Sequence, residues 1–157
     1  LGPLIQRVRA TTDKHVMVKL TPNVTDIAAL AKVAVQAGAD SLSAINTLLG
    51  LVIDLENRRP LLGGVTGGLS GPAIKPVALR MAWEVAQSVD VPVIGIGGIA
   101  SGVDALEFIC VGCQAVQVGT MNFQNPQAPS QIAVEIEKWL LKHDVTKLSE
   151  LVGTLRT

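Results

Sequence analysis

Two spacing patterns of apolar residues alternate along the chain. Short segments at residues 16–20, 41–46, 91–98 and 115–118 are predicted to be strands, and the continuous apolar run at 16–20 indicates a strand buried in a parallel sheet. Apolar residues at three- and four-residue spacing predict helices over residues 3–12, 25–36, 72–89 and 101–112, a long helix that opens at 125, and a short one over 147–155. The chain is therefore expected to be an α/β protein in which strands and helices alternate.

Residues 47–71 interrupt this alternation. Residues 48–54 and 59–66 are expected to form a β-hairpin, and the glycine-rich stretch 67–71 is predicted to be flexible. Two interpretations of that stretch stay open: a mobile loop over a ligand, or an ordinary turn before the helix that starts at Pro72.

The strand–helix unit recurs with the same internal spacing. Asn46 lies eight residues after Gly38, and Thr120 lies eight residues after Gly112; both glycines suit helix C-terminal caps. Repeated units with short links predict a parallel sheet, either doubly wound or part of a (β/α)8 barrel. Polar residues or glycines end all four strands, which favours a barrel, since the working residues of barrels lie there. A whole barrel needs eight strands and about 250 residues, so the sequence predicts half a barrel or a small open sheet.

The strand ends also suggest an anion site. Gly97-Gly98 and Gly119-Thr120 follow neighbouring strands, and glycines let backbone N–H groups approach phosphate oxygens closely. Ser101 opens the next helix, whose N-terminus favours an anion. The alternative for each glycine pair is a tight turn without a ligand.

Two other strand ends carry groups that could contact a ligand. Lys19 interrupts an apolar strand, and it is either a fixed cation facing an anionic ligand or ring, or a side chain that reaches solvent. Asn46 and Thr47 could hydrogen-bond a planar polar substrate, or could cap the loop locally.

The composition argues against a nucleic-acid partner, a membrane partner and a metal site. The chain has 13 basic and 13 acidic residues and only 3% aromatic residues, with no Tyr, so no nucleic-acid partner is expected. No apolar run reaches the 18 residues of a transmembrane helix, and no membrane partner is expected. Cys110 and Cys113 have no accompanying Cys or His pair, so they are expected to be structural and no metal site is predicted.

Several segments, in this order, resemble dihydroorotate dehydrogenases. They are Val-Lys-Leu-Thr-Pro-Asn-Val-Thr-Asp (18–26), Ile-Asn-Thr (45–47), Thr-Gly-Gly-Leu-Ser-Gly-Pro-Ala-Ile-Lys-Pro (66–76), Ile-Gly-Gly-Ile (96–99) and Val-Gly-Thr (118–120). The resemblance covers nearly the whole chain and is greatest to catalytic subunits of the B-type, NAD-linked subclass. It implies that residues 1–157 are the carboxyl-terminal half of an FMN-binding (β/α)8 TIM barrel, four parallel strands with their helices, and that the amino-terminal half is absent from this chain.

The resemblance also implies FMN-dependent oxidation of dihydroorotate to orotate in pyrimidine biosynthesis. By match, Lys19 is expected to face the pyrimidine edge of the flavin, and Ile45 and Gly71 to line the flavin. The FMN phosphate is expected to contact Gly97, Gly98, Gly119 and Thr120, and the substrate to contact Asn46 and Thr47.

No catalytic base is assigned in this chain. The base of the B-type family is a cysteine expected in the absent half, and neither Cys110 nor Cys113 matches it, so the segment alone is expected to be inactive. The full-length protein is expected to be a cytoplasmic homodimer that works with an iron–sulfur and FAD subunit using NAD.

Two alternatives remain open. One is a dihydropyrimidine dehydrogenase-like flavoprotein, and the other is a non-catalytic half barrel that binds a phosphorylated ligand. Because open half barrels expose sheet edges, the segment by itself is expected to dimerise or to pair with its missing half.

Overall fold

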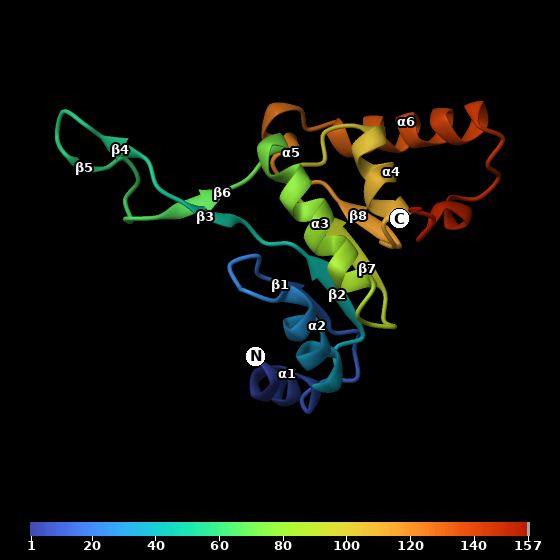
Figure 1. The fold of residues 1–157 in the computed structure, drawn as a ribbon, viewed down its shortest axis with the longest axis horizontal. Coiled ribbons are helices and arrows are strands. Elements are labelled where there is room, and N and C mark those ends of the chain that lie inside the picture. The colour runs from blue at the N-terminus through green and yellow to red at the C-terminus, as the bar shows by residue number, and fades with distance from the viewer. Residues whose placement is uncertain (157) are drawn as a thin grey trace.

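A four-stranded parallel sheet forms the centre of the structure, a computed structural model that describes residues 1–156 (Figure 1). Its strands are β1 (Met17–Leu20), β2 (Ser41–Ala44), β7 (Val93–Ile96) and β8 (Ala115–Gln117), in the spatial order β1-β2-β7-β8. All three neighbouring pairs are parallel. The predicted α/β class and the four parallel strands are confirmed.

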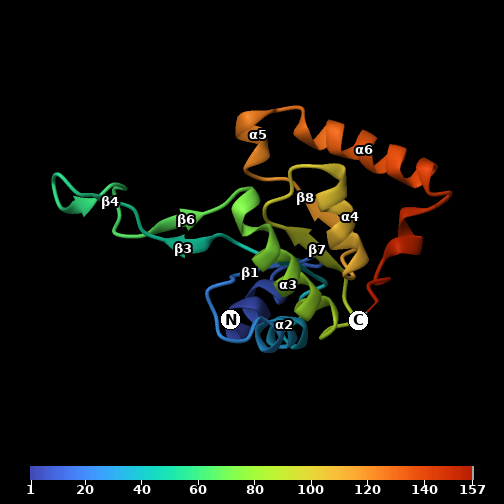
Figure 2. The same cartoon turned by 45° about the horizontal axis from the view of Figure 1, so that its top comes forward.

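Three helices connect these strands and pack beside the sheet (Figure 2). They are α2 (Ile27–Gln36), α3 (Lys75–Ala86) and α4 (Gly102–Cys110). Helix α1 (Gly2–Arg9) packs on α2, and α6 (Ala128–Lys142) packs on α4. The helix expected over 147–155 is a single 3-10 turn, Leu148–Leu151, and a second 3-10 turn, Pro72–Ile74, leads into α3.

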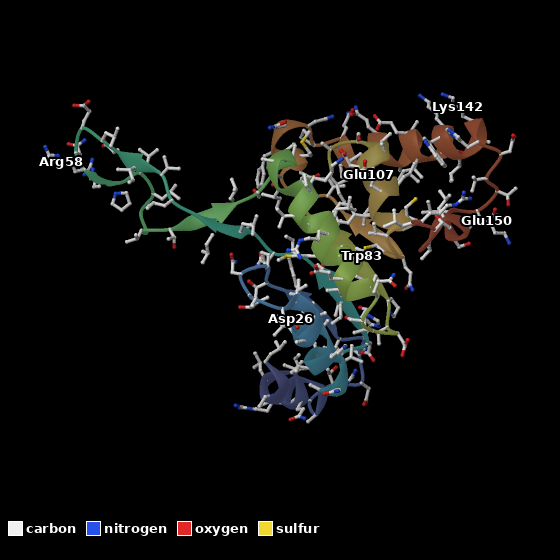
Figure 3. All side chains as sticks on the ribbon, in the orientation of Figure 1. Asp26, Arg58, Trp83, Glu107, Lys142 and Glu150 are labelled. Atoms are coloured by element: carbon white, nitrogen blue, oxygen red, sulfur yellow. The ribbon has the colours of Figure 1, made fainter. Side chains whose placement is uncertain are left out.

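Side-chain caps and glycines mark the boundaries of α2 and α4. The Asp26 carboxylate (labelled in Figure 3) accepts a hydrogen bond from the Ala29 N–H at 2.9 Å and starts α2. The Ser101 hydroxyl does the same for the Asp104 N–H at 3.2 Å and starts α4. Gly38 and Gly112 follow α2 and α4 with positive φ angles of 103° and 114°, a conformation that favours glycine.

Burial differs between the inner and outer strands. β2 is buried along its whole length and β7 along most of it, as expected for strands with a neighbour on each side. β1 and β8 are only partly buried; Met17, for example, is 45% exposed. The predicted burial of residues 16–20 is therefore wrong for most of β1. Within residues 1–156, β1 and β8 each pair with another strand along one edge only.

Residues 48–69 form an arm that extends away from the sheet (Figure 1). At its base, β3 (Leu48–Gly50) pairs antiparallel with β6 (Gly67–Leu69), and further out β4 (Ile53–Asp54) pairs with β5 (Arg59–Pro60). The arm departs from the expected hairpin, since the first two glycines of the stretch predicted to be flexible belong to a strand. A Cβ at Gly68 would lie 2.6 Å from the Thr47 Oγ1, so a side chain at this position would collide with Thr47 at the base of the arm.

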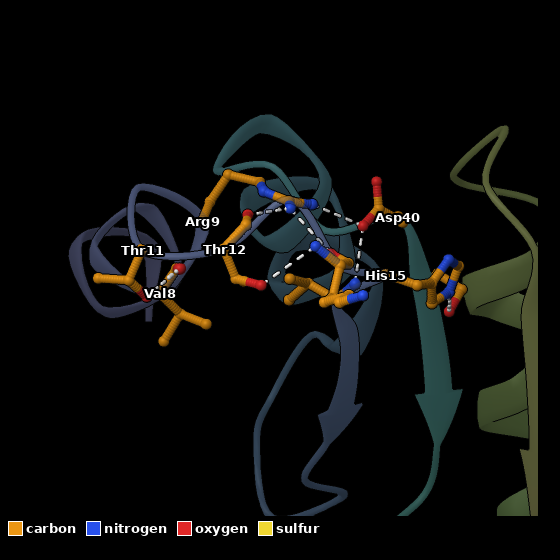
Figure 4. Close-up of polar contacts among 9 residues, drawn as sticks. Val8, Arg9, Thr11, Thr12, His15 and Asp40 are labelled. Atoms are coloured by element: carbon orange, nitrogen blue, oxygen red, sulfur yellow. Dashed lines mark hydrogen bonds and ion pairs between the residues drawn. The ribbon is translucent and has the colours of Figure 1, made fainter.

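A polar cluster ties α1 to the start of β2 (Figure 4). The Arg9 guanidinium donates to the Asp40 carboxylate at 2.7 Å and to the carbonyls of Thr12 and Lys14. The same Asp40 oxygen accepts a hydrogen bond from the Val16 N–H at 2.7 Å. The Val16 N–H and the Arg9 charge together hold the pKa of Asp40 below its usual value, so Asp40 is ionised at neutral pH and ties the segment that precedes β1 to the start of β2.

Within residues 1–156, every helix is too short or too polar to cross a membrane.

We expect the contact between β7 and α4 to tolerate no side chain at Gly95. A Cβ there would lie 2.9 Å from the Phe108 Cγ and 3.1 Å from the Cys113 Sγ, and both of those side chains are fully buried. Gly95→Ala should therefore lower the free energy of unfolding by about 1–3 kcal/mol. Urea denaturation followed by circular dichroism measures the change.

The matched control is Gly63→Ala in the arm, where a Cβ meets no atom within 4 Å. Its effect should stay within about 0.5 kcal/mol. Equal unfolding midpoints for the Gly95→Ala variant and the parent protein would show that this contact is not tightly packed.

Candidate functional site

A cavity of about 420 Å³ lies at the carboxyl ends of the four parallel strands. Its lining includes all nine residues that the sequence singles out: Lys19, Ile45, Asn46, Thr47, Gly71, Gly97, Gly98, Gly119 and Thr120. They meet because parallel strands end at the same edge of a sheet, although as many as 101 residues of chain separate Lys19 from Thr120. The volume suits a small-molecule ligand, while the role of each residue toward a ligand stays a prediction.

The two glycine-containing strand ends leave the backbone accessible to the cavity. Gly97 and Gly98 have φ angles of 138° and 74°. A Cβ at Gly98 would lie 2.7 Å from the Lys75 backbone nitrogen, whereas a Cβ at Gly119 would meet no atom within 4 Å. Within residues 1–156 the N–H groups of Gly98, Ile99, Gly119 and Thr120 donate no hydrogen bond to the protein. They can therefore donate to an anionic ligand.

The N-terminus of α4 is less open than the sequence suggests. The Ala100 N–H donates to the Asp104 carboxylate at 3.0 Å, and the Gly102 N–H donates to the Glu135 carboxylate at 2.6 Å. These two carboxylates therefore already interact with the positive end of the α4 dipole and accept hydrogen bonds from N–H groups that an anion would otherwise contact. The N–H groups left for an anion are those of the glycine-containing loops.

Lys19 reaches solvent with its side chain, as one of its two interpretations expects, and its role toward a ligand stays a prediction. It is the third residue of β1, its side chain is exposed, and it lines the cavity. It makes no ion pair within the described part of the chain. Because the ammonium group remains solvated, the cost of burying a lysine does not arise, and its charge is available to a bound anion.

Asn46 and Thr47 are held in place by local hydrogen bonds. The Asn46 Oδ1 accepts from the Thr47 N–H at 2.9 Å, which is the expected loop cap. Asn23 holds the same segment from the other side, since its Nδ2 donates to the Thr47 carbonyl at 3.0 Å and its Oδ1 accepts from the Leu49 N–H at 3.0 Å. The Asn46 Nδ2 donates no hydrogen bond within residues 1–156 and can donate to a ligand. Ile45, which follows a cis peptide bond at Ala44–Ile45, is buried beneath them.

Several lining residues were not predicted. Ser70 accepts a hydrogen bond from the Thr120 hydroxyl at 2.8 Å and thereby joins the base of the arm to the end of β8. Met121, Asn122 and Phe123 reach the cavity from α5 (Met121–Gln124), and Phe123 is 91% exposed. A four-residue helix has too little periodicity to be predicted. Ser70 could have been inferred from its place beside Gly71.

The two cysteines do not line this cavity. Cys113 is fully buried, and burial raises the pKa of its thiol to about 12. Cys110 is partly exposed at the end of α4. No group of three His, Cys, Asp or Glu side chains within residues 1–156 is arranged to hold a metal ion.

Parallel βα units with a ligand-sized cavity at the carboxyl ends of the strands define a class, the barrel-type α/β proteins. Within that class, a family model described as dihydroorotate dehydrogenase matches residues 2–140, and the chain belongs to this family.

Curated relatives agree with this assignment. The chain is 59% identical over 152 residues to the catalytic subunit of dihydroorotate dehydrogenase B (NAD(+)) from Trichlorobacter lovleyi, with 97% of this chain and 50% of the relative covered. Subunits with the same description are 58% identical in Geobacter metallireducens and 56% identical in Pelobacter propionicus; the matches cover 98% of this chain and 50% and 51% of those proteins. The resemblance to B-type catalytic subunits is confirmed, and the chain spans about half the length of these relatives, as expected for part of a barrel.

We expect Cys113 to resist alkylation while the protein is folded. Because its thiol is buried and its pKa is about 12, almost no thiolate is present or accessible at pH 8. In the Cys110→Ser variant, iodoacetamide should leave the remaining thiol unmodified in buffer and modify it in urea, as intact mass will show. Rapid modification in buffer would contradict the buried placement.

Proposed function

We propose that the complete protein catalyses FMN-dependent oxidation of dihydroorotate to orotate in pyrimidine biosynthesis. In this proposal, residues 1–157 form the carboxyl-terminal half of its barrel and supply the FMN phosphate site and part of the substrate site. The supporting facts are the family match and the half-length coverage of catalytic subunits. The single observation that carries the proposal is the convergence of all nine candidate residues on one cavity.

The residues around the cavity have chemistry that fits FMN. A phosphate dianion needs several N–H donors and little competing negative charge, and the N–H groups of Gly98, Ile99, Gly119 and Thr120 have no protein acceptor within the described chain. Thr120 also lines the cavity, with its hydroxyl hydrogen-bonded to Ser70. A flavin ring needs an apolar surface and polar contacts at its pyrimidine edge, for which the cavity offers Ile45 and Lys19.

When bound, FMN would accept the hydride that leaves the substrate. Lys19 would favour negative charge at the pyrimidine edge of the ring, since its ammonium is not paired with a carboxylate of the described chain. The amide of Asn46 and the hydroxyl of Thr47 would orient the planar substrate. The proton-abstracting base is assigned to the half of the barrel outside this chain, where B-type enzymes are expected to carry a cysteine.

The partners of the complete protein follow from the same proposal. The relatives are described as catalytic subunits of an NAD(+) enzyme, a description that implies a second subunit for electron transfer. We propose that this partner carries an iron–sulfur cluster and FAD, that the catalytic subunit is a homodimer, and that the complex is cytoplasmic.

The complete gene product should purify with FMN and oxidise dihydroorotate, with little or no activity on dihydrouracil. Absorbance near the flavin bands and orotate formation measure the two properties. Activity on dihydrouracil alone would favour a dihydropyrimidine dehydrogenase-like enzyme, and binding of a phosphorylated ligand without turnover would favour the non-catalytic module. A protein that neither contains nor binds FMN would overturn the proposal.

Lys19→Met should lower kcat/KM for dihydroorotate by about 100-fold, because it removes a positive charge that acts on the reacting ring. The control is Lys32→Met, which removes an exposed lysine of α2 outside the cavity and should leave kcat/KM within about twofold. Equal kinetics for both variants would remove Lys19 from the catalytic machinery.

A further inference from the structure

We propose that Lys75, Asp104 and Glu107 form a charge cluster that positions the loop 97–101 and neutralises it for the FMN phosphate. The inference rests on the proposed binding of FMN. It assigns to these three residues a role that the resemblance to the family does not imply. None of the three lines the cavity, so they act as positioning residues behind the loop.

The cluster joins two helices through one ammonium group. The Lys75 Nζ, from the first residue of α3, donates to the Asp104 Oδ1 at 2.6 Å and to the Glu107 Oε2 at 2.7 Å. Both carboxylates belong to α4, and Figure 3 labels Glu107 there. The side chains of Lys75 and Asp104 are 25% and 16% exposed. This pair is therefore screened by solvent less than an ordinary surface ion pair.

Asp104 connects the cluster to the loop 97–101. Its Oδ2 accepts hydrogen bonds from the Ala100 N–H at 3.0 Å and from the Ser101 hydroxyl at 2.9 Å. One carboxylate thus holds the Lys75 ammonium with one oxygen and the end of the loop with the other. Charge-assisted hydrogen bonds of this kind fix geometry better than neutral ones.

The start of the loop meets the backbone of the same lysine. A Cβ at Gly98 would lie 2.7 Å from the Lys75 nitrogen and 2.9 Å from the Gly71 carbonyl oxygen. The loop is thereby packed against Lys75 at Gly98 and hydrogen-bonded through Asp104 at Ala100 and Ser101. The N–H groups of Gly98 and Ile99, which have no protein acceptor within residues 1–156, lie between these two attachments.

The cluster also affects the net charge beside the loop 97–101. Asp104, Glu107 and Glu135 bring three carboxylates to α4 and its N-terminus, and among residues 1–156 Lys75 is the cation paired with the first two. The hydrogen bonds that Lys75 donates to Asp104 and Glu107 raise the pKa of Lys75. Burial raises the pKa of Asp104, but the hydrogen bonds from Lys75, Ala100 and Ser101 outweigh it and keep that pKa below its usual value. Lys75 and Asp104 are therefore both charged at neutral pH, so removing Lys75 would leave the Asp104 carboxylate uncompensated beside the loop.

The test compares FMN with riboflavin, which lacks the phosphate. In the flavin-free complete gene product, Lys75→Met and Lys75→Gln should each raise the Kd of FMN by about tenfold or more, while the Kd of riboflavin changes by less than about threefold. Lys75→Arg, which keeps the charge, should restore FMN binding to near the parent value. Quenching of flavin fluorescence measures both ligands.

Two further variants distinguish a loss of charge compensation from a general structural effect on α3. Lys75→Met combined with Asp104→Asn removes one of the two carboxylates that Lys75→Met leaves unpaired, the one that contacts the loop, so it should bind FMN more tightly than Lys75→Met alone. Arg80→Met removes the exposed Arg80–Glu84 ion pair on the same helix, outside the cavity, and should leave FMN binding unchanged.

Two results would overturn this inference and leave the proposed function standing. One is an equal loss of affinity for FMN and riboflavin in Lys75→Met and Lys75→Gln, and the other is unchanged FMN binding in these two variants. A parent protein that binds neither flavin would overturn the proposed function as well.

Discussion

Parallel pairing of β1, β2, β7 and β8 is the constraint on which the candidate site depends. The ladders place Leu20 beside Ala44, Ala44 beside Gly95, and Ile96 beside Gln117, so the strands end together at one edge. The residues that follow the strands then have to meet there. This explains why short motifs far apart in the chain line one cavity, and why the loops, rather than the strands, supply most of the polar groups.

Positive and negative groups lie close together at that edge of the sheet. Backbone N–H groups of the glycine-containing loops and the Lys19 ammonium favour an anion, while Asp104 and Glu135 bring carboxylates to the start of α4. Lys75 offsets part of this negative charge. The carboxylates stabilise the loop by accepting hydrogen bonds that water would otherwise make, and the lysine lets them do so beside a site suited to an anion.

Most of the fold and seven of the nine candidate residues could be predicted from local patterns, whereas Ile45 and Gly71 were assigned by the resemblance to the family. Apolar runs located the strands, three- and four-residue spacing located the main helices, and Gly38 and Gly112 marked helix ends. The errors lie where local sequence is a poor guide. Outer strands are half exposed because burial depends on neighbours. The arm pairs Leu48–Gly50 with Gly67–Leu69, although glycines locally suggest a flexible stretch there. Helix α5 is too short to show a period.

The sequence by itself determined which elements form and which residues end the strands, because propensity, apolar spacing and capping act over a few residues. Only the tertiary structure decided which distant groups touch. Lys75 reaches Asp104, 29 residues away, Glu135 reaches Gly102, and Ser70 reaches Thr120. These contacts depend on how α3, α4, α6 and the arm pack around the sheet. Ion pairs and hydrogen bonds act over a few ångströms of space, and separation along the chain does not reveal that distance.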